Sequence, residues 1–361
     1  MNGITVERLR AVIPTLDLPS FVYDPAIVTA NVRSVRDAFP GYHYPVKCNA
    51  HPALMRAAVA AGAELDLCSD GDLDAAEEIS ALTPRSSYTG AGLTPKLFAR
   101  IAAARCRANL DSLHEVALWA RLFPGRAFGV RLQTGYDVKF GLTPPEVEKA
   151  RAMAGNLVGI HVHDSHRGRT ADQAMAVLAA ALQTLDATLI RDLEYVSLGG
   201  GWPHAYEGET EWNVREVAAA FDARPMRELQ ERGFHGQVLI EPGEFIVARA
   251  GAWIARVATV KTDRDSGPLV ILDTPTPIPC ADYAYPMTLM RGMEVVGYGD
   301  VMCTIHGSTN SGRDRIRRGV LLPDPLPGDV VTIHDTGAYV QALISRFNER
   351  RPPSTYVLPP A

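Results

Sequence analysis

Two hydrophobic patterns alternate over roughly the first 250 residues of the chain. Short apolar runs typical of buried strands recur, and Ala/Leu/Glu/Arg-rich segments with helical spacing lie between them. Thr94-Pro95 and Thr143-Pro144 predict helix starts, and Gly62 predicts a helix end. The eight predicted strands are 43–48, 63–68, 86–89, 107–110, 127–132, 157–163, 193–198 and 237–241.

The predicted helices fall between these strands, and one further helix, 25–39, precedes the first strand. Eight strand–helix units in about 230 residues favour an α/β fold with a parallel (β/α)8 TIM-like barrel. An open doubly wound sheet is the alternative, and the count of eight argues against it. The helices between strands are 52–61, 72–82, 95–105, 113–123, 145–154, 171–185 and 214–231.

After residue 251 the pattern changes to short strands separated by Pro- and Gly-rich turns. This change predicts a β-rich C-terminal domain over 251–361, following a barrel over 23–250. Residues 1–22 are the candidate for an N-terminal segment that joins the β domain with a strand of its own. The predicted strands of the β domain are 253–262, 268–272, 293–298, 301–305 and 329–334.

Composition narrows the class of protein. The 361 residues are 47% hydrophobic and 21% charged, as in a soluble globular protein. A net charge of −5, with both signs interspersed, argues against a nucleic-acid partner. No signal peptide or membrane-length apolar run is present, so we expect a cytoplasmic protein without a membrane partner. Five scattered cysteines fit reduced thiols and predict no metal site: Cys48, Cys68, Cys106, Cys280 and Cys303.

Candidate functional residues stand at the C-terminal ends of the predicted strands, where the active site of such a barrel forms. Lys47 ends the first strand; burial would lower the pKa of its amine, and a neutral amine can form a Schiff base. A surface lysine extending into solvent is the alternative. The other residues at these ends are Asp66, Ser69, Arg131, His163, Gly199–Gly201 and Glu241-Pro242-Gly243.

Three of these groups suit a flat, phosphorylated cofactor. Gly199–Gly201 offer unobstructed N–H groups to a phosphate, although a flexible turn explains the glycines alone equally well. The Glu241 carboxylate would keep a pyridine nitrogen protonated, and His163 would stack on a ring. A helix-start carboxylate and a hydrogen-bonded core histidine are the structural alternatives. With a Schiff-base amine, these groups match the needs of pyridoxal 5′-phosphate.

The motifs together resemble the fold-type III pyridoxal-phosphate decarboxylases, which include ornithine, arginine and diaminopimelate decarboxylases, over nearly the whole chain. The matching segments are Tyr44-Pro-Val-Lys47-Cys-Asn49, Gly159-Ile-His-Val-His163, Leu198-Gly-Gly-Gly201-Trp-Pro203, Glu241-Pro-Gly243, Gly307-Ser-Thr-Asn310-Ser-Gly-Arg-Asp314, Leu326-Pro-Gly328-Asp329 and Asp335-Thr-Gly337-Ala-Tyr339.

This resemblance implies a PLP-dependent amino-acid decarboxylase. It also implies a homodimer whose active sites take residues from both subunits, with the 307–314 segment reaching into the partner's site. The site roles it implies are a Schiff base at Lys47, ring stacking by His163, a ring-nitrogen contact by Glu241, phosphate contacts by Gly199–Gly201 and Tyr339, and positions near the cofactor for Asp66, Arg131 and Gly243.

The chain departs from the family pattern in four places, one of them a pair of residues. Ser165 and His166 stand where the family has a Gly-Ser pair whose serine binds phosphate, which makes His166 the candidate donor. Glu244 stands where the family has a phosphate-binding arginine. Asn310 replaces a catalytic cysteine that returns a proton, and Ser311 replaces the acidic residue that holds a distal amine. The proton would then come from His306, Cys280, Tyr283, Lys47 or water.

The replacements at Asn310 and Ser311 predict a substrate other than free ornithine or lysine, because a distal cation meets no counter-charge there. A modified, carrier-linked or otherwise specialised amino acid of secondary metabolism fits better, with Asn310 and Ser311 as substrate contacts. Two alternative functions stay open: a PLP-dependent racemase, epimerase or eliminating lyase, and a catalytically silent homologue that binds the cofactor or a partner.

Overall fold

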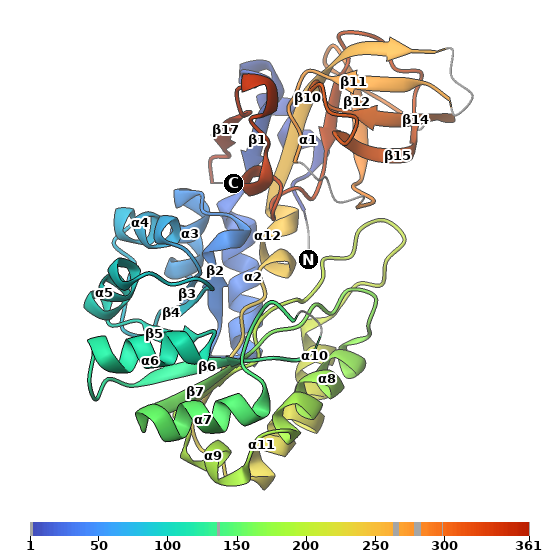
Figure 1. Cartoon of the computed structure of the whole chain (residues 1–361). Helices are drawn as coiled ribbons and strands as arrows, with labels where there is room; N and C mark the ends of the chain where they lie inside the picture. The colour runs from blue at the N-terminus through green and yellow to red at the C-terminus, as the bar shows by residue number, and fades with distance from the viewer. Residues whose placement is uncertain (1–2, 136–137, 263–266, 278–282, 298, 361) are drawn as a thin grey trace. The chain divides into compact units, whose positions relative to one another are not determined.

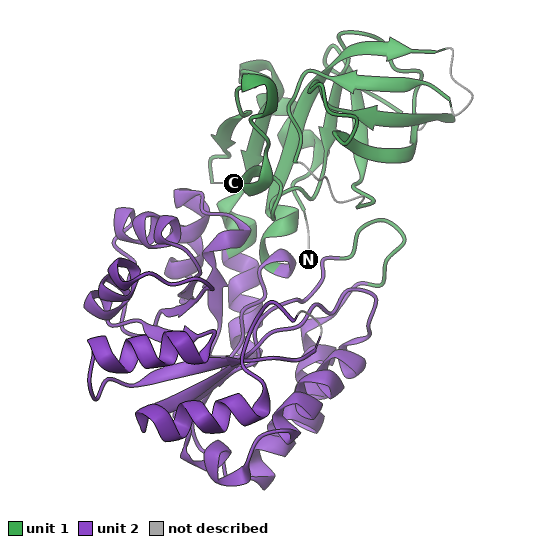
Figure 2. Ribbon diagram, in the orientation of Figure 1, with its two compact units in different colours: residues 1–28, 205–210, 246–361 green, residues 29–204, 211–245 purple. Residues whose placement is uncertain are grey.

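The computed structural model describes residues 3–135, 138–262, 267–277, 283–297 and 299–360. The chain divides into two compact units (Figure 2). The barrel unit comprises residues 29–204 and 211–245, and the β unit comprises residues 1–28, 205–210 and 246–361.

Eight parallel strands in chain order, β2 to β9, form the sheet of the barrel unit. A parallel bridge between Tyr42 and Ile240 joins the last strand to the first, and the His43 N–H donates to the Ile240 carbonyl at 2.9 Å. The sheet therefore closes into the predicted TIM-like barrel, and the open sheet was the wrong alternative. The strands are β2 His43–Pro45, β3 Glu64–Leu67, β4 Ser87–Thr89, β5 Arg107–Leu110, β6 Phe128–Leu132, β7 Leu157–Val162, β8 Tyr195–Ser197 and β9 Gln237–Leu239.

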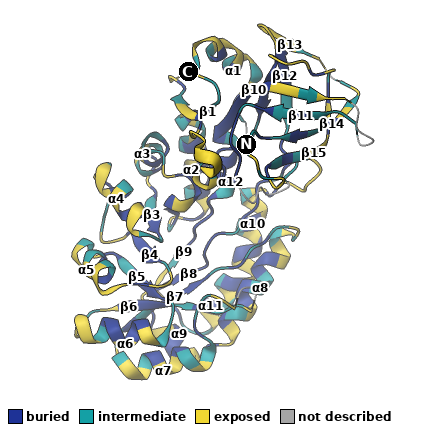
Figure 3. Ribbon diagram, turned by 45° about the horizontal axis from the view of Figure 1, so that its top comes forward, coloured by how far each residue is buried: buried dark blue, intermediate teal, exposed yellow. Residues whose placement is uncertain are grey.

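Helices lie outside these strands, with their outer faces exposed and the strands buried (Figures 1 and 3). The predicted helix 214–231 is broken into two by a π-helical turn at Asp222–Met226 that contains Pro225. Proline has no N–H to continue the helical hydrogen bonds, which accounts for the break. The helices are α2 Pro25–Ala38, α3 Pro52–Ala60, α4 Asp70–Glu78, α5 Pro95–Ala104, α6 Leu113–Leu122, α7 Pro144–Ala154, α8 Ala171–Gln183, α9 Ala187–Asp192, α10 Val214–Phe221, α11 Arg227–Glu231 and α12 Glu244–Val247.

The β unit is built on a mixed sheet in the order β13-β12-β16-β10-β11-β14-β15. Strand β1 pairs with β10 and β17, so the N-terminal segment contributes a strand as predicted. Strands β12, β15 and β17 were not predicted, and residue 298 of the predicted strand 293–298 lies outside the described residues. The elements are α1 Val6–Val12, β1 Ser20–Tyr23, β10 Gly251–Lys261, β11 Leu269–Leu272, β12 Met287–Arg291, β13 Glu294–Val296, β14 Val301–His306, β15 Arg315–Leu322, β16 Val330–Ile333 and β17 Ser354–Val357.

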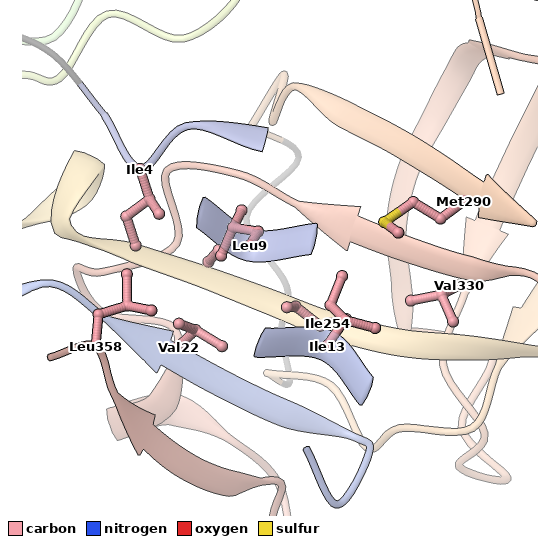
Figure 4. Packing of buried hydrophobic residues seen from close by; sticks show 9 residues of the cluster. Ile4, Leu9, Ile13, Val22, Ile254, Met290, Val330 and Leu358 are labelled. Atoms are coloured by element: carbon pink, nitrogen blue, oxygen red, sulfur yellow. The ribbon is translucent and has the colours of Figure 1, made fainter. Parts of the chain in front are cut away.

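Apolar side chains from both ends of the chain share one core in the β unit (Figure 4). Leu9 of α1 and Val22 of β1 pack in one cluster with Ile254 of β10 and Leu358 near the C-terminus. Each buried side chain of this size contributes about 1.5–3 kcal/mol. The N-terminal residues are therefore an integral layer of the β unit.

Candidate active site

A cavity of about 300 Å³ lies at the C-terminal ends of the barrel strands. Its volume is at the lower end of the range for small-molecule sites. Three predicted residues from three different strand ends, Lys47, Arg131 and His163, line it together. The full lining is Lys47, Thr89, Arg131, Leu132, Thr134, Phe140, His161 and His163.

Lys47 is presented by a turn and not by the strand itself. Strand β2 ends at Pro45, and Val46–Cys48 form a single 3-10 turn. Gly243 packs against this turn so closely that a Cβ atom there would lie 2.8 Å from Pro45 Cγ. The Cys48 thiol is buried, in keeping with a packing role, while the Lys47 side chain stays 39% exposed.

The amine of Lys47 lies near carboxylates. Its Nζ atom is 3.8 Å from Oδ2 of Asp66, an oxygen without a hydrogen-bond partner among the described residues. Desolvation of the amine lowers the pKa of Lys47, but the neighbouring Asp66, Cys68 and Glu241 outweigh it, and the pKa is raised. The prediction of a lowered pKa was therefore wrong, because it considered desolvation without these neighbouring charges.

Glu241 carries a negative charge behind His161, which lines the cavity. Its Oε1 accepts a hydrogen bond from Ser197 Oγ at 2.6 Å, and its Oε2 lies 3.0 Å from Nε2 of His161. Burial raises the pKa of Glu241, but His161, Ser197 and Lys47 outweigh it and the pKa is lowered. This buried carboxylate is thus ionised at neutral pH.

His161 and His163 present two nearly parallel imidazole rings. Their centroids are 6.3 Å apart and their planes differ by 5°. The N–H of Gly200 donates to Nδ1 of His163 at 3.3 Å, which fits a neutral ring with its proton on Nε2. Burial, reinforced by Lys47, lowers the pKa of His163 well below its ordinary value. The cavity therefore has a flat, uncharged ring in its wall.

The Gly199–Gly201 segment is closely packed backbone. A Cβ atom on Gly200 would lie 2.2 Å from the Glu241 carbonyl oxygen, so no larger residue fits. The N–H of Gly199 donates to Ser197 Oγ at 3.2 Å, and that of Gly200 donates to His163. Two of the three N–H groups expected to cradle a phosphate are therefore used within the protein. Neither of these two hydrogen bonds uses the N–H of Gly201, which is therefore the candidate donor to a phosphate.

His166 lies beside this segment. Its N–H donates to the Gly201 carbonyl at 3.2 Å, and its ring stacks on Trp212 with centroids 6.2 Å apart. Both ring nitrogens are buried and lack a hydrogen-bond partner among the described residues. Burial lowers the pKa of His166 to about 4, so the ring is neutral at neutral pH. Buried polar atoms without partners are uncommon and call for a ligand or water.

Glu244 pairs with an arginine from the loop that follows β7. Its Oε1 accepts from the Arg167 guanidinium at 2.5 Å, and Arg167 also donates to the His204 carbonyl at 3.4 Å. The position where the family pattern has an arginine thus carries a carboxylate that orients an arginine from elsewhere in the chain. No role for Arg167 was predicted from the sequence, because Arg167 and Glu244 are 77 residues apart and no local pattern connects them.

Asn310, Ser311 and Tyr339 lie in the β unit. The Asn310 N–H donates to Asn348 Oδ1 at 2.8 Å, and the Ser311 N–H donates to Thr309 Oγ1 at 3.4 Å. Tyr339 has a positive φ of 60° and is partly buried.

Two of the proton sources suggested by the sequence are also in the β unit. Nδ1 of His306 is 3.2 Å from Oδ1 of Asp314, and the Tyr283 ring stacks on Tyr206 with centroids 4.8 Å apart. Cys280 lies outside the described residues.

Sequence reasoning gave no site role to Thr89, Phe140, His161 or Ser197. The Arg131 guanidinium lies over the Phe140 ring, 4.3 Å from its centroid. The His-Val-His spacing was a usable signal for His161, because alternate residues of a strand face the same side. Thr89 and Ser197 become recognisable only once the ends of β4 and β8 are known.

Residues 26–248 match the sequence profile of the family described as "Pyridoxal-dependent decarboxylase, pyridoxal binding domain". The chain belongs to this family. A diaminopimelate decarboxylase from Deinococcus radiodurans is 28% identical over 362 residues, which cover 93% of this chain and 89% of that protein.

Two solved structures share the fold. A lysine/ornithine decarboxylase from Vibrio vulnificus, complexed with cadaverine, has a TM-score of 0.84 at 22% identity and covers 98% of this chain and 97% of its own. A diaminopimelate decarboxylase from Helicobacter pylori, complexed with L-lysine, has a TM-score of 0.84 at 19% identity, with 97% and 94% covered.

The cofactor of this family is pyridoxal phosphate, and the residues at the strand ends fit it. The cavity offers an amine for an aldehyde and a flat neutral ring for stacking. The buried His166 nitrogens without partners suit an anionic group near Gly201. Among the described residues, no cluster of three His, Cys, Asp or Glu side chains could hold a metal ion, and no helix has the length and apolarity to cross a membrane.

Proposed function

We propose that this protein removes the carboxylate of an amino acid or amino-acid derivative as CO2, with Lys47 as the covalent anchor of pyridoxal phosphate. The observation that carries the proposal is the single cavity of about 300 Å³ lined by Lys47, Arg131 and His163. When bound, the cofactor supplies an electron sink for the cleaved bond. The protein's own residues bind, orient and move protons around it.

The amine of Lys47 would hold the aldehyde carbon, and His163 would present its ring face to the cofactor ring. The ionised Glu241 favours the protonated form of the ring nitrogen, because opposite charges stabilise each other in a buried site. Asp66, at 3.8 Å from the Lys47 amine, would receive or return protons at that nitrogen. Arg131 supplies a cation at the same cavity.

The phosphate would bind beside the glycine segment. We assign its contacts to the Gly201 N–H, to His166 and to Arg167. The family resemblance implies Tyr339 as a further phosphate contact. A guanidinium matches the geometry of phosphate oxygens, and Glu244 would hold Arg167 in place without touching the phosphate. This assignment accounts for a carboxylate at position 244 beside an anionic ligand.

The Gly307–Asp314 segment favours a substrate without a distal cation. Its single carboxylate, Asp314, is buried, and both oxygens are engaged, one near His306 and one by the Thr309 N–H at 2.9 Å. The exposed charge of the segment is Arg313. The positive charge of Arg313 repels an ammonium group but does not repel a neutral or anionic distal group, as in a modified or carrier-linked amino acid.

We infer a homodimer in which this segment completes the partner's site, as the family resemblance implies. Mixing Lys47→Ala and Asp314→Ala subunits tests the inference. If sites are shared, the mixture regains up to about a quarter of the wild-type rate, because half of the dimers carry one intact site. If each site is made by one subunit, no activity returns.

A substrate panel tests the proposed reaction. The purified enzyme is incubated in deuterated water with ornithine, lysine, diaminopimelate and N-acylated or neutral-tailed analogues, and CO2 release and Cα–H exchange are followed. CO2 from the modified amino acids supports the proposal. Efficient decarboxylation of ornithine or lysine would refute the substrate assignment, and Cα–H exchange without CO2 would refute decarboxylation.

A further inference from the structure

A chain of hydrogen bonds runs through the barrel interior from Asp66 toward the N-terminal end of the strands. Ser87 Oγ is 3.1 Å from Oδ1 of Asp66 and 3.0 Å from Nδ1 of His43. The three residues come from β3, β4 and β2, and all are buried. The other oxygen of Asp66 faces the Lys47 amine at 3.8 Å. The chain thus ends beside the nitrogen proposed to hold the cofactor.

The outer end of the chain reaches a second cavity. This cavity has a volume of about 690 Å³, and His43 lines it together with residues from the starts of the strands, such as Glu64 and Arg107. Ser87 and Asp66 do not line it. His43 is therefore the member of the chain that can exchange a proton with water at the N-terminal end of the barrel.

The hydrogen-bonded residues Asp66, Ser87 and His43 can place their protons in two ways without gaining or losing one. In one, neutral Asp66 donates to Ser87, and Ser87 donates to Nδ1 of neutral His43. In the other, protonated His43 donates to Ser87, and Ser87 donates to the Asp66 carboxylate. Passing between them breaks one O–H bond at Asp66 and one at Ser87, and forms one O–H bond and one N–H bond. The position of one proton thus decides whether Asp66 is charged.

Burial and the surrounding charges act on both ends of this hydrogen-bonded chain. Burial raises the pKa of Asp66, as does Glu241, whereas Lys47 and Ser87 act in the opposite direction. Burial lowers the pKa of His43 to about 4, with opposing contributions from the charges around it. Further neighbours shift the pKa of each member. Asp72 acts on Asp66, and Cys68 and Arg131 act on Lys47. The neighbours of His43 are Glu241, Arg107, Glu64 and Arg85.

We propose that His43 and Ser87 are positioning residues that control whether Asp66 is charged beside the Lys47 amine. The proposal rests on the proposed role of Lys47. Ser87 supplies the hydroxyl that stabilises the Asp66 carboxylate, and His43 competes for that hydroxyl when it is neutral and directs it to Asp66 when it is protonated from the N-terminal cavity. The protonation of Lys47 is thereby tied to a histidine at the opposite end of the barrel.

Carbon-13 NMR of the lysine side chains tests this in the full chain without cofactor. The chain has five lysines, so ε-13C-labelled protein gives few resonances, and Lys47→Arg assigns the one from Lys47. In Ser87→Ala, Asp66 loses its donor and becomes neutral more readily. The pKa of Lys47 should then fall by roughly one unit. His43→Phe removes the acceptor that the Ser87 hydroxyl uses while His43 is neutral, so Ser87 donates to Asp66 and the pKa of Lys47 should rise. His43→Asn, which can place an amide oxygen near the position of Nδ1, should restore the wild-type pKa.

Ser86→Ala is the matched control, because Ser86 is also buried but its hydroxyl accepts from the Thr83 N–H outside the chain of three. An unchanged Lys47 titration in folded Ser87→Ala and His43→Phe would overturn the proposal. If Ser87→Ala does not fold, an unchanged Lys47 titration in His43→Phe alone would overturn the proposal, with His43→Asn as its comparison. A borohydride label that misses Lys47 would refute the proposed function and leave the NMR result standing.

Discussion

The two ends of the barrel differ in how their charges are used. The N-terminal cavity is the larger, at about 690 Å³ against about 300 Å³. Its charged groups have protein partners, as with Arg85 and Glu64 at 2.6 Å and Arg107 and Gln237 at 2.7 Å. At the C-terminal end, Oδ2 of Asp66 has no hydrogen-bond partner among the described residues and faces Lys47. Nε of Arg36, which lines the N-terminal cavity, also lacks a hydrogen-bond partner among the described residues, so an unpaired atom alone does not mark the reactive end. The C-terminal end differs in that an amine, that of Lys47, faces such an unpaired oxygen.

Removing the negative charge behind the C-terminal cavity should have the largest effect. Glu241→Gln keeps the shape and the hydrogen bond to Ser197 but loses the charge that favours a protonated ring nitrogen. The rate of CO2 release should fall about 10²–10³-fold, as for other preorganised charges in active sites. Steady-state kinetics with the absorbance spectrum of the bound cofactor checks this. A rate within a few-fold of wild type contradicts the role of Glu241.

Acid should weaken the fold through a buried histidine at each end. Burial lowers the pKa of His43 and of His166 to about 4, whereas an unfolded histidine titrates near about 6.5. The unfolded state therefore binds more protons between these values, and the free energy of unfolding falls as the pH drops through this range. At pH 5 the loss is about 2 kcal/mol per histidine relative to neutral pH.

Urea denaturation at pH 7 and pH 5 measures this loss. His43→Asn cannot gain a proton in this range, so its stability should change less between the two pH values than that of wild type. An equal change in both proteins would show that His43 is not held neutral in the folded state.

Arg167→Gln should weaken cofactor binding about tenfold, because one charge-assisted hydrogen bond to the phosphate is lost. Equilibrium dialysis and phosphorus-31 NMR of the bound phosphate would detect the change. Arg151→Gln is the matched control, since Arg151 forms an exposed pair with Asp192. Equal cofactor affinity in both variants would exclude Arg167 from the phosphate site.

The smallest effect is expected at the N-terminal end. Arg85→Gln removes an ion pair whose arginine is 69% exposed. Such pairs contribute about 0–1 kcal/mol, so thermal unfolding should shift little and the rate of CO2 release should not change. A large loss of activity in a folded Arg85→Gln protein would contradict the contrast between the two ends.

The barrel was predictable because its strands and helices alternate and its helices carry local start signals. Thr143-Pro144 begins α7 as predicted, with the Glu146 carboxylate accepting from the Thr143 N–H at 2.9 Å. Strand β15, Arg315–Leu322, was missed because arginine and glycine occupy half of its positions and interrupt the apolar residues, of which only Ile316, Val320 and Leu322 are buried. Charged strands with one buried face give a weak periodic signal.

The candidate site was predictable only in part. Residues at strand ends, such as Lys47 and His163, follow from the barrel geometry, and the structure brings them to one cavity. The raised pKa of Lys47 and the pairing of Arg167 with Glu244 depend on side chains far apart in sequence. Such contacts depend on which residues face inward, and this is settled by strand register.

Reduction of the purified, cofactor-loaded protein with borohydride, followed by peptide mapping, tests the central assignment most directly. We predict a pyridoxyl group on the peptide that contains Lys47 and on none of the other four lysine positions of the chain. A label on another lysine, or a protein that takes up no cofactor, would contradict the account.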